Sequence, residues 1–106
     1  YLSGQGGDDD LRGGAGDDVL RGGEGSDALR GGGGADFFEF ASGHGVNLVE
    51  DFEDGLDRIR ILNGADDIGD LTITDPAGGA RIVFDGTTIR LEGVDASALT
   101  SADFLF

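Results

Sequence analysis

The apolar residues in the first half of the chain recur every nine positions. Between residues 4 and 39, four copies of one unit follow in register, with the template G-G-x-G-x-D-x-U-x, where U is a large apolar residue. Positions 1 and 4 are always Gly and position 6 is always Asp, and Gln5, at position 2, is the one departure. This pattern predicts a tight loop of six turn-forming residues followed by a very short strand.

Two degenerate copies follow, at residues 42–50 and 52–60. One apolar side chain in each unit cannot make a core alone, so the units must wind into a coil whose turns stack at strand spacing. Because every loop reverses the chain, we expect units two apart to become neighbours in two parallel sheets. One sheet then stacks Leu11, Leu29 and Val49, and the other stacks Leu2, Leu20, Phe38 and Ile59.

The second half shows the alternation of ordinary strands. Apolar and polar residues alternate in DRIRIL, LTITD, ARIVFD and TTIRLEG, and DPAGGA (75–80) and Asp85-Gly86 are turn signals between them. After Gly93 we expect short helical turns capped by Asp95 and Thr100. The residues expected to point inward are Leu71, Ile73, Ile82, Phe84, Ile89 and Leu91.

The predicted fold class is therefore all-β. Residues 1–60 form a right-handed parallel β-roll, with clear repeats at 4–39 and degenerate repeats at 42–60. Residues 61–106 form a small antiparallel cap and a tail. A coil of stacked strands needs such a cap, since its last turn otherwise exposes a strand edge and the core.

Composition adds a strong negative charge to this picture. The 106 residues include 22 Asp and Glu against 7 Arg, so the formal net charge is -15, and Cys is absent. Nucleic acid and anionic membranes are therefore poor partners, and neither disulfides nor thiolate metal sites are available. No apolar run approaches the roughly 18 residues of a membrane span. The chain begins at Tyr1, and we expect it to be the tail of something longer.

The predicted stacking brings the position-6 side chains together in pairs. It places Asp9 near Asp27, Asp27 near Asn47, Asp18 near Asp36, and Asp36 near Asp57. No Lys or Arg lies within the loops to neutralise these carboxylates. Paired oxygen ligands beside backbone carbonyls are the donor set that Ca²⁺ prefers, whereas Mg²⁺ gives up its waters reluctantly. We therefore predict several calcium ions in the loops.

The repeat resembles the calcium-binding nonapeptide of the RTX (repeats-in-toxin) family. The resemblance implies ions between loops two apart, bound by Asp9, Asp18, Asp27 and Asp36, with Asn47 as a weaker ligand. VEDFEDGLDRIRI resembles the end of the family's roll, which adds Asp51 and Asp57 as candidate ligands. The candidate carbonyl donors are Gly13, Ala15, Gly22, Glu24, Gly31 and Gly33.

The resemblance also implies a function. It favours a calcium-binding module that folds outside the cell, supports the type I export of a larger secreted bacterial protein, and lies beside an upstream domain of that parent chain. The closing DFLF resembles the end of type I secretion substrates. Its alternative is a final strand of the cap, and the two roles are compatible. We expect a monomer that binds calcium and no nucleic acid.

Two other functions stay open. One is a polysaccharide-binding module of a carbohydrate-modifying enzyme, and the other is a scaffold fragment of a secreted protease or lipase. Catalysis by the chain itself is not expected, because the carboxylates recur at every repeat and no nucleophile or zinc motif is present. His44, the one histidine, occupies a variable loop position and is expected to face solvent.

Overall fold

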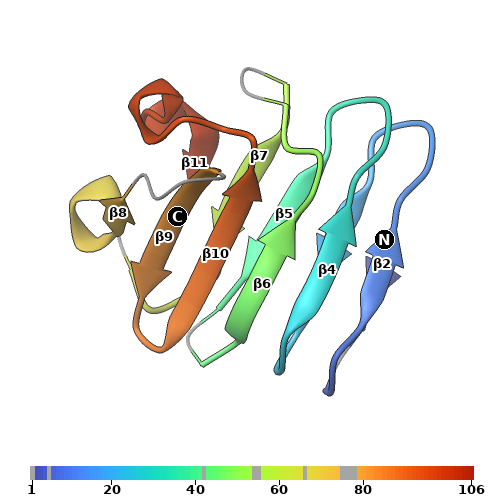
Figure 1. Cartoon of the computed structure of the whole chain (residues 1–106), viewed down its shortest axis with the longest axis horizontal. Coiled ribbons are helices and arrows are strands. Elements are labelled where there is room, and N and C mark those ends of the chain that lie inside the picture. The colour runs from blue at the N-terminus through green and yellow to red at the C-terminus, as the bar shows by residue number, and fades with distance from the viewer. Residues whose placement is uncertain (1, 5, 42, 54–55, 66, 75–78) are drawn as a thin grey trace.

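The computed structural model describes residues 2–4, 6–41, 43–53, 56–65, 67–74 and 79–106. Among them, short strands form two sheets that face each other (Figure 1). The first sheet has the order β1 (Leu2–Ser3), β3 (Val19–Arg21), β5 (Phe37–Phe40), β7 (Arg58–Ile61) and β11 (Phe104–Leu105). The second has the order β2 (Asp10–Arg12), β4 (Asp27–Arg30), β6 (Gly45–Val49), β10 (Thr87–Glu92), β9 (Gly79–Phe84) and β8 (Thr72–Thr74).

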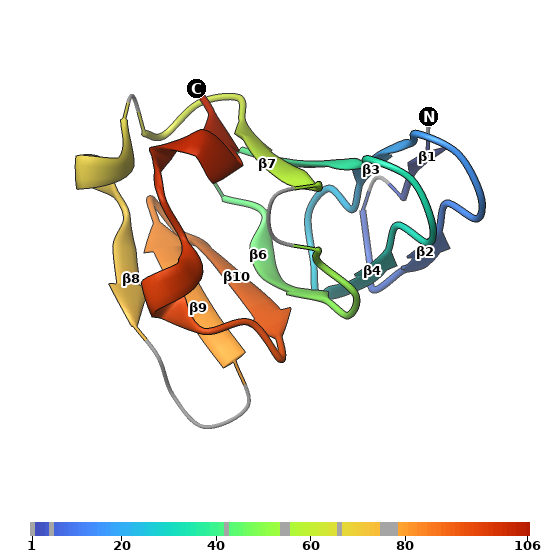
Figure 2. The same ribbon diagram turned by 90° about the horizontal axis from the view of Figure 1, so that it is seen from above.

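The seven strands from β1 to β7 alternate between the two sheets, and each pairs in parallel with the strand two along the chain. Figure 2 shows β1 and β3 across the interior from β2 and β4, with a loop at each reversal of the chain. The register pairs Leu11 with Leu29 and Leu29 with Val49 in the second sheet. In the first sheet it runs Leu2, Leu20, Phe38 and Ile59, so both predicted stacks are confirmed.

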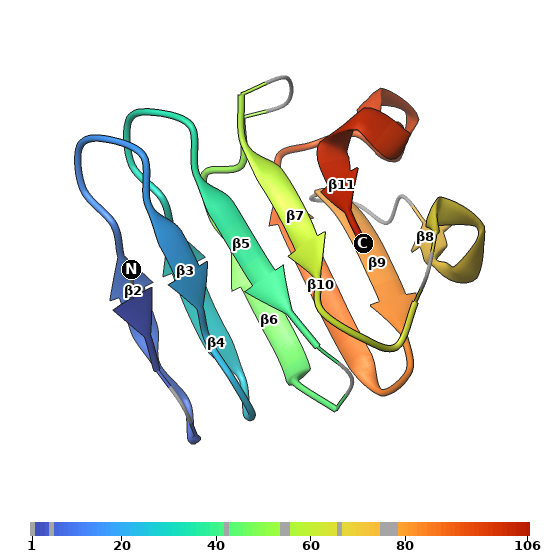
Figure 3. The ribbon, with the colours of Figure 1, turned by 180° about the vertical axis from the view of Figure 1, so that it is seen from behind.

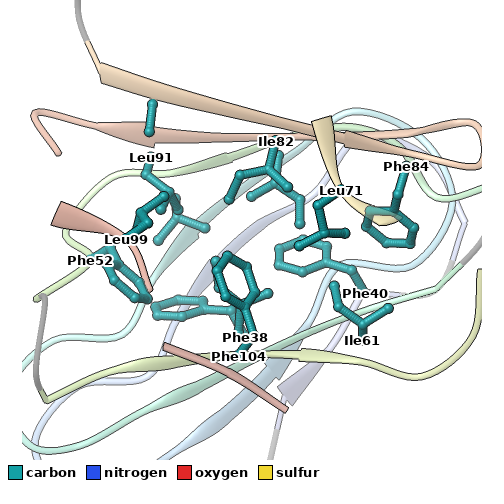
Figure 4. Close-up of a cluster of buried hydrophobic side chains, with 14 of the residues drawn as sticks. Phe38, Phe40, Phe52, Ile61, Leu71, Ile82, Phe84, Leu91, Leu99 and Phe104 are labelled. Carbon is teal, nitrogen blue, oxygen red and sulfur yellow. The ribbon is translucent and has the colours of Figure 1, made fainter. Parts of the chain in front are cut away.

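The core lies between these two sheets. Leu20, Leu29, Phe38, Val49 and Ile59 are fully buried. At the first turn of the roll, the equivalent side chains of Leu2 and Leu11 are only partly buried. The inward side chains are therefore more buried near the cap than at the first turn. Figure 4 shows the hydrophobic cluster there, which includes Phe38, Phe40, Phe52, Phe84 and Phe104.

The C-terminal strands close the roll by extending both of its sheets. Strand β10 pairs in parallel with β6, with Ile89 opposite Asn47 and Leu91 opposite Val49, and β9 and β8 then follow in antiparallel order. Strand β11 pairs in parallel with β7, next to which Figure 3 shows it. The antiparallel cap is thus confirmed, and it covers the last turn by pairing with it. Each sheet contains strands from both sides of residue 60, where we placed the boundary between roll and cap.

The inward face of the cap follows the predicted alternation. Leu71, Ile82, Phe84, Ile89 and Leu91 are buried, and Ile73 packs partly buried against the same core. The β9–β10 hairpin turns at Asp85 and Gly86, which have φ of 35° and 81°, as a two-residue turn of this kind requires. Most of the predicted DPAGGA turn lies outside the described residues.

The cap and the tail contain short 3-10 turns, and the tail ends in a last strand. In the cap, η1 (Ile68–Asp70) precedes β8, and in the tail η2 (Ala96–Ala98) and η3 (Ser101–Asp103) precede β11. Thr100 caps η3 in a capping box with Asp103, as predicted, but the exposed side chain of Asp95 makes no capping hydrogen bond to η2. Phe104 is buried in β11, which confirms the strand alternative for DFLF. No described helix is long and apolar enough to cross a membrane.

Candidate metal centre

The position-6 side chains form two ladders across the loops. The backbone N–H of Asp9 donates to Asp27 Oδ1, and that of Asp18 donates to Asp36 Oδ1, both at 2.8 Å. Asp36 N–H donates to Asp57 Oδ1 at 2.8 Å. Asn47 lies in register with Asp27. The four pairs predicted from the repeat length are therefore in place.

One oxygen of each of five position-6 side chains is buried without a hydrogen-bond partner. These atoms are the Oδ2 atoms of Asp9, Asp18, Asp27 and Asp36 and the Oδ1 atom of Asn47. They are the only such side-chain atoms in the described part of the chain. A buried polar atom without a partner is costly, and its recurrence in five successive repeats points to a partner such as a cation.

The position-1 glycines make room for these oxygens. A Cβ atom added to Gly4, Gly22 or Gly31 would overlap the Oδ2 atom of the Asp five residues later. At Gly13 the added Cβ would lie 2.7 Å from Asp18 Oδ2 and 2.7 Å from the carbonyl oxygen of Gly31, two repeats on. The free carboxylate oxygen therefore points back into the loop of its own repeat, toward backbone and away from the apolar core.

Backbone carbonyls supply the remaining candidate donors. Among the described residues, no three His, Cys, Asp or Glu side chains cluster as a metal site would require, so side chains alone do not complete a coordination shell. Within the same residues, many loop carbonyls accept no backbone hydrogen bond, and they include those of Gly13, Ala15, Gly22, Glu24, Gly31 and Gly33. These six are the carbonyl donors predicted from the sequence, and their role as ligands of a hard cation stays a prediction.

Asp51 and Asp57 differ from the five side chains that have an unpartnered oxygen, because both carboxylate oxygens of each already accept hydrogen bonds from backbone N–H groups. Asp51 Oδ1 and Oδ2 accept from the N–H groups of Gly31 and Gly32 at 2.9 and 2.8 Å. Asp57 Oδ1 accepts from Asp36, and its Oδ2 accepts from Glu53 at 2.9 Å. The structure thus brings both residues to the loops, with no unpartnered oxygen to offer.

Two further carboxylates reach neighbouring loops and were missed from the sequence. Asp8 Oδ1 accepts from Ser26 N–H at 2.9 Å, and Asp17 Oδ1 accepts from Ala35 N–H at 2.8 Å. Both acids occupy position 5 of their repeats, and both donors occupy position 5 two repeats later. Asp at position 5 in two consecutive repeats was the available signal.

The burial of these carboxylates changes their acidity. Burial raises the pKa of Asp36 to about 6, and the charges of Asp57 and Asp18 add to the rise. Burial also raises the pKa of Asp27, with a further contribution from Asp9, and that of Asp57, with a contribution from Glu53. Without a cation, the ladders therefore hold negative charge at a cost in free energy.

Comparison with known proteins agrees with this geometry. Residues 3–38 match the RTX calcium-binding nonapeptide repeat in four copies. This segment belongs to the RTX repeat family. RTX repeats are calcium-binding elements, and the matched residues overlap the four units at residues 4–39. Comparison with curated protein sequences gives no match.

Solved structures share the fold of nearly the whole chain. The extracellular lipase LipA from Serratia marcescens is similar with a TM-score of 0.73 and 24% identity, over 94% of this chain and 20% of the lipase. The AlgE6R3 subunit from the Azotobacter vinelandii mannuronan C5-epimerase is similar with a TM-score of 0.68 and 26% identity, over 96% of this chain and 79% of the subunit. The chain thus spans about a fifth of the lipase and most of the epimerase subunit, and its fold is a β-roll.

Acid is expected to promote folding of the chain when calcium is absent. Because the pKa of Asp36 rises from 3.8 to about 6 on folding, the folded state binds more protons than the unfolded chain between these values. Stability is therefore gained as the pH falls through about 6 and lost as it rises again. Far-UV circular dichroism in a chelator should show more β-structure at about pH 5 than at about pH 7.5.

The matched variant is Asp36→Asn, which is uncharged at both pH values and should weaken the dependence on pH. In saturating calcium the trend should reverse, because protons then compete with the metal for the same oxygens. A calcium-free chain whose β-structure grows with rising pH would contradict the assignment of the raised pKa to the folded ladder.

His44 is buried, so the expectation that it faces solvent is wrong. The ring Nδ1 of His44 accepts from the backbone N–H of Ala41 at 3.2 Å, and the backbone N–H of His44 donates to Thr87 Oγ1 at 2.9 Å. The Thr87 hydroxyl in turn donates to the Ala41 carbonyl at 2.6 Å. Burial lowers the pKa of His44, and the charge of Arg21 lowers it further. His44 is buried because β10 pairs with β6 and covers the loop that contains His44. The pairing of β10 with β6 was not predicted from the sequence.

Proposed function

We propose that this chain is a calcium-binding RTX module that folds when calcium fills its loops. The observation that carries the proposal is the set of five buried side-chain oxygens without partners, one at each of five successive position-6 sites. A core or a linker has no reason to repeat such a costly atom at nine-residue intervals. A cation between loops provides the partner that each of these oxygens lacks.

The donor set favours calcium over other metals. The side-chain ligands we propose are Asp9, Asp18, Asp27, Asp36 and Asn47, and the carbonyl ligands are those of Gly13, Ala15, Gly22, Glu24, Gly31 and Gly33. All donors are oxygens, whereas zinc and copper sites use the softer sulfur and nitrogen ligands of Cys and His. A site made of backbone carbonyls and shared carboxylates lets calcium take six to eight ligands, whereas magnesium retains several waters.

The wider role is argued from the chain's charge and from its relatives. With a net charge of -15 and many glycines, the chain has little reason to fold where calcium is scarce. We propose that it folds outside the cell, stabilises a larger secreted protein and has no catalytic activity of its own. Its partners would be calcium, an upstream domain of that protein and the type I secretion machinery during export.

A polysaccharide-binding role is the second candidate. It is favoured by the likeness to the mannuronan C5-epimerase subunit and by Arg81 and Arg90, which lie opposite each other on β9 and β10. Both side chains are exposed, and neither makes an ion pair within the described residues. The strong negative charge of the whole chain opposes a polyanionic ligand, so this candidate stays second.

The test is the calcium affinity of two variants in the same ladder. Asp27 pairs with both Asp9 and Asn47, whereas Asp9 pairs with Asp27 alone among the described residues. Asp27→Ala should therefore weaken two sites and Asp9→Ala only one. Calorimetric titration of the chelator-treated chain with calcium chloride should show the larger loss in Asp27→Ala, and magnesium should not replace calcium. Equal losses in the two variants would contradict pairing between alternate loops.

A further inference from the structure

Carboxylates outside position 6 hold the loop at residues 31–36 by its backbone. On one side, Asp17 Oδ1 accepts from Ala35 N–H at 2.8 Å, across 18 residues of sequence. Asp17 is exposed, and it precedes Asp18, which pairs with Asp36 of the same loop. The hydrogen bond therefore links the two loops that present this pair, from a position next to the free oxygens.

On the other side, Asp51 binds the start of the same loop. Its two oxygens accept from Gly31 and Gly32, whose consecutive N–H groups form a small anion-binding nest. Strand β5, which follows the loop, is already paired with β3 and β7. The loop is thus fastened at its beginning by Asp51 and near its end by Asp17, without any metal.

We propose that Asp17 and Asp51 are positioning residues for the metal site of the loop at residues 31–36, and not ligands. They hold the loop at the distance at which Asp18 and Asp36 share one ion, so the site is formed before the ion arrives. The inference rests on the proposed calcium-binding function and extends it to residues outside position 6. Charge and glycine entropy oppose order in an empty loop, so hydrogen bonds that are already made lower the cost of binding.

The roles of ligand and positioning residue predict different effects of an amide. A ligand carboxylate loses a charge at the metal when it is replaced by Asn. A positioning residue in the geometry of Asp17 needs only one acceptor oxygen for Ala35, which Asn also provides. Asp17→Asn and Asp17→Ala remove the same charge and differ in the acceptor, so their comparison isolates the hydrogen bond.

The experiment is calcium titration of the full chain by calorimetry, with amide hydrogen exchange at Ala35 in saturating calcium. Asp17→Ala should weaken calcium binding about fivefold with the number of ions unchanged, since one net hydrogen bond is lost. Asp17→Asn should stay within about twofold of the native affinity. Exchange at Ala35 should be faster in Asp17→Ala only. Asp95→Ala, which removes an exposed carboxylate that makes no capping bond, is the control for charge.

A second pair of variants covers the possibility that Asp17→Ala does not fold. Asp8 makes the same bond to Ser26, so Asp8→Ala and Asp8→Asn should differ in the same way. Equal loss in the Ala and Asn variants would overturn the inference, and so would one fewer ion in Asp17→Asn, which would make Asp17 a ligand. If the native chain binds no calcium, the proposed function fails, whereas native binding with indistinguishable variants refutes the positioning role alone.

Discussion

Calcium removal is expected to unfold most of the roll. The ladders contain four pairs of position-6 side chains, each with at least one unpartnered oxygen, and an ion bound between the members of a pair would stabilise only the folded state. If free calcium is tenfold above the dissociation constant, one site adds ~1.4 kcal/mol, and four independent sites add roughly 6 kcal/mol. That sum is comparable to the whole stability of a small domain, which is about 5–15 kcal/mol.

The measurement is far-UV circular dichroism at neutral pH between excess EDTA and millimolar calcium, with magnesium as the control cation. A large gain of β-structure should appear with calcium and not with magnesium. The melting temperature should also rise with calcium concentration above saturation, because an ion that binds only the folded state acts by mass action. Unchanged β-structure across the titration would refute calcium-dependent folding, although not the fold itself.

Alanine at Gly32 is expected to disrupt the stacking of the loops. Gly32 has φ of 83°, and an added Cβ would overlap the carbonyl oxygen of Gly14, two repeats earlier, with the carbonyl carbon at 2.9 Å. The positive φ costs roughly 1–2 kcal/mol for any other residue, and the contact with rigid backbone adds about as much or more. Loss of about 3 kcal/mol or more is expected in calcium-loaded protein.

Two other glycines of the repeats distinguish the strain of a positive φ from the clash with the backbone of another loop. Gly14 has φ of 85°, but no atom of the described residues lies within 4 Å of an added Cβ, so Gly14→Ala should cost only the strain of about 1 kcal/mol. Gly33 has no positive φ and no close atom among the described parts of the chain, and Gly33→Ala should stay within about 0.5 kcal/mol of the native protein. Urea unfolding in saturating calcium gives the three values. Equal effects at Gly14 and Gly32 would argue against close stacking of alternate loops.

The repeating half of the fold was predictable because its period determines the geometry. A nine-residue unit that reverses the chain once places Leu20 against Phe38 and Asp18 against Asp36, whatever the rest of the chain does. The five oxygens without partners belong to this same period. The roles of side chains at the variable positions of the repeat were harder to predict. Those of Asp8 and Asp17 depend on which backbone N–H lies opposite them two repeats later.

The junction between roll and cap was the least predictable part. Alternation identified β9 and β10 as strands, but it contains no information on which strand of the roll β10 joins. Its parallel pairing with β6 places Ile89 in the row of Asn47, which ends that ladder with an apolar residue, and it buries His44 behind Thr87. These contacts join residues more than 40 positions apart, so no local pattern specifies them.

The sequence by itself determined the roll, its two apolar stacks, the paired position-6 oxygens and the presence of a cap, because all of these follow from periodicity and from the chemistry of single residue types. Only the tertiary structure decided how the remaining carboxylates are used. Asp51 and Asp57 have the same chemistry as Asp36, yet their oxygens already accept from backbone N–H groups, whereas Asp36 keeps one oxygen free. That difference depends on which amide hydrogens the folded loops bring within 3 Å of each oxygen, and so it exists only once distant segments have packed together.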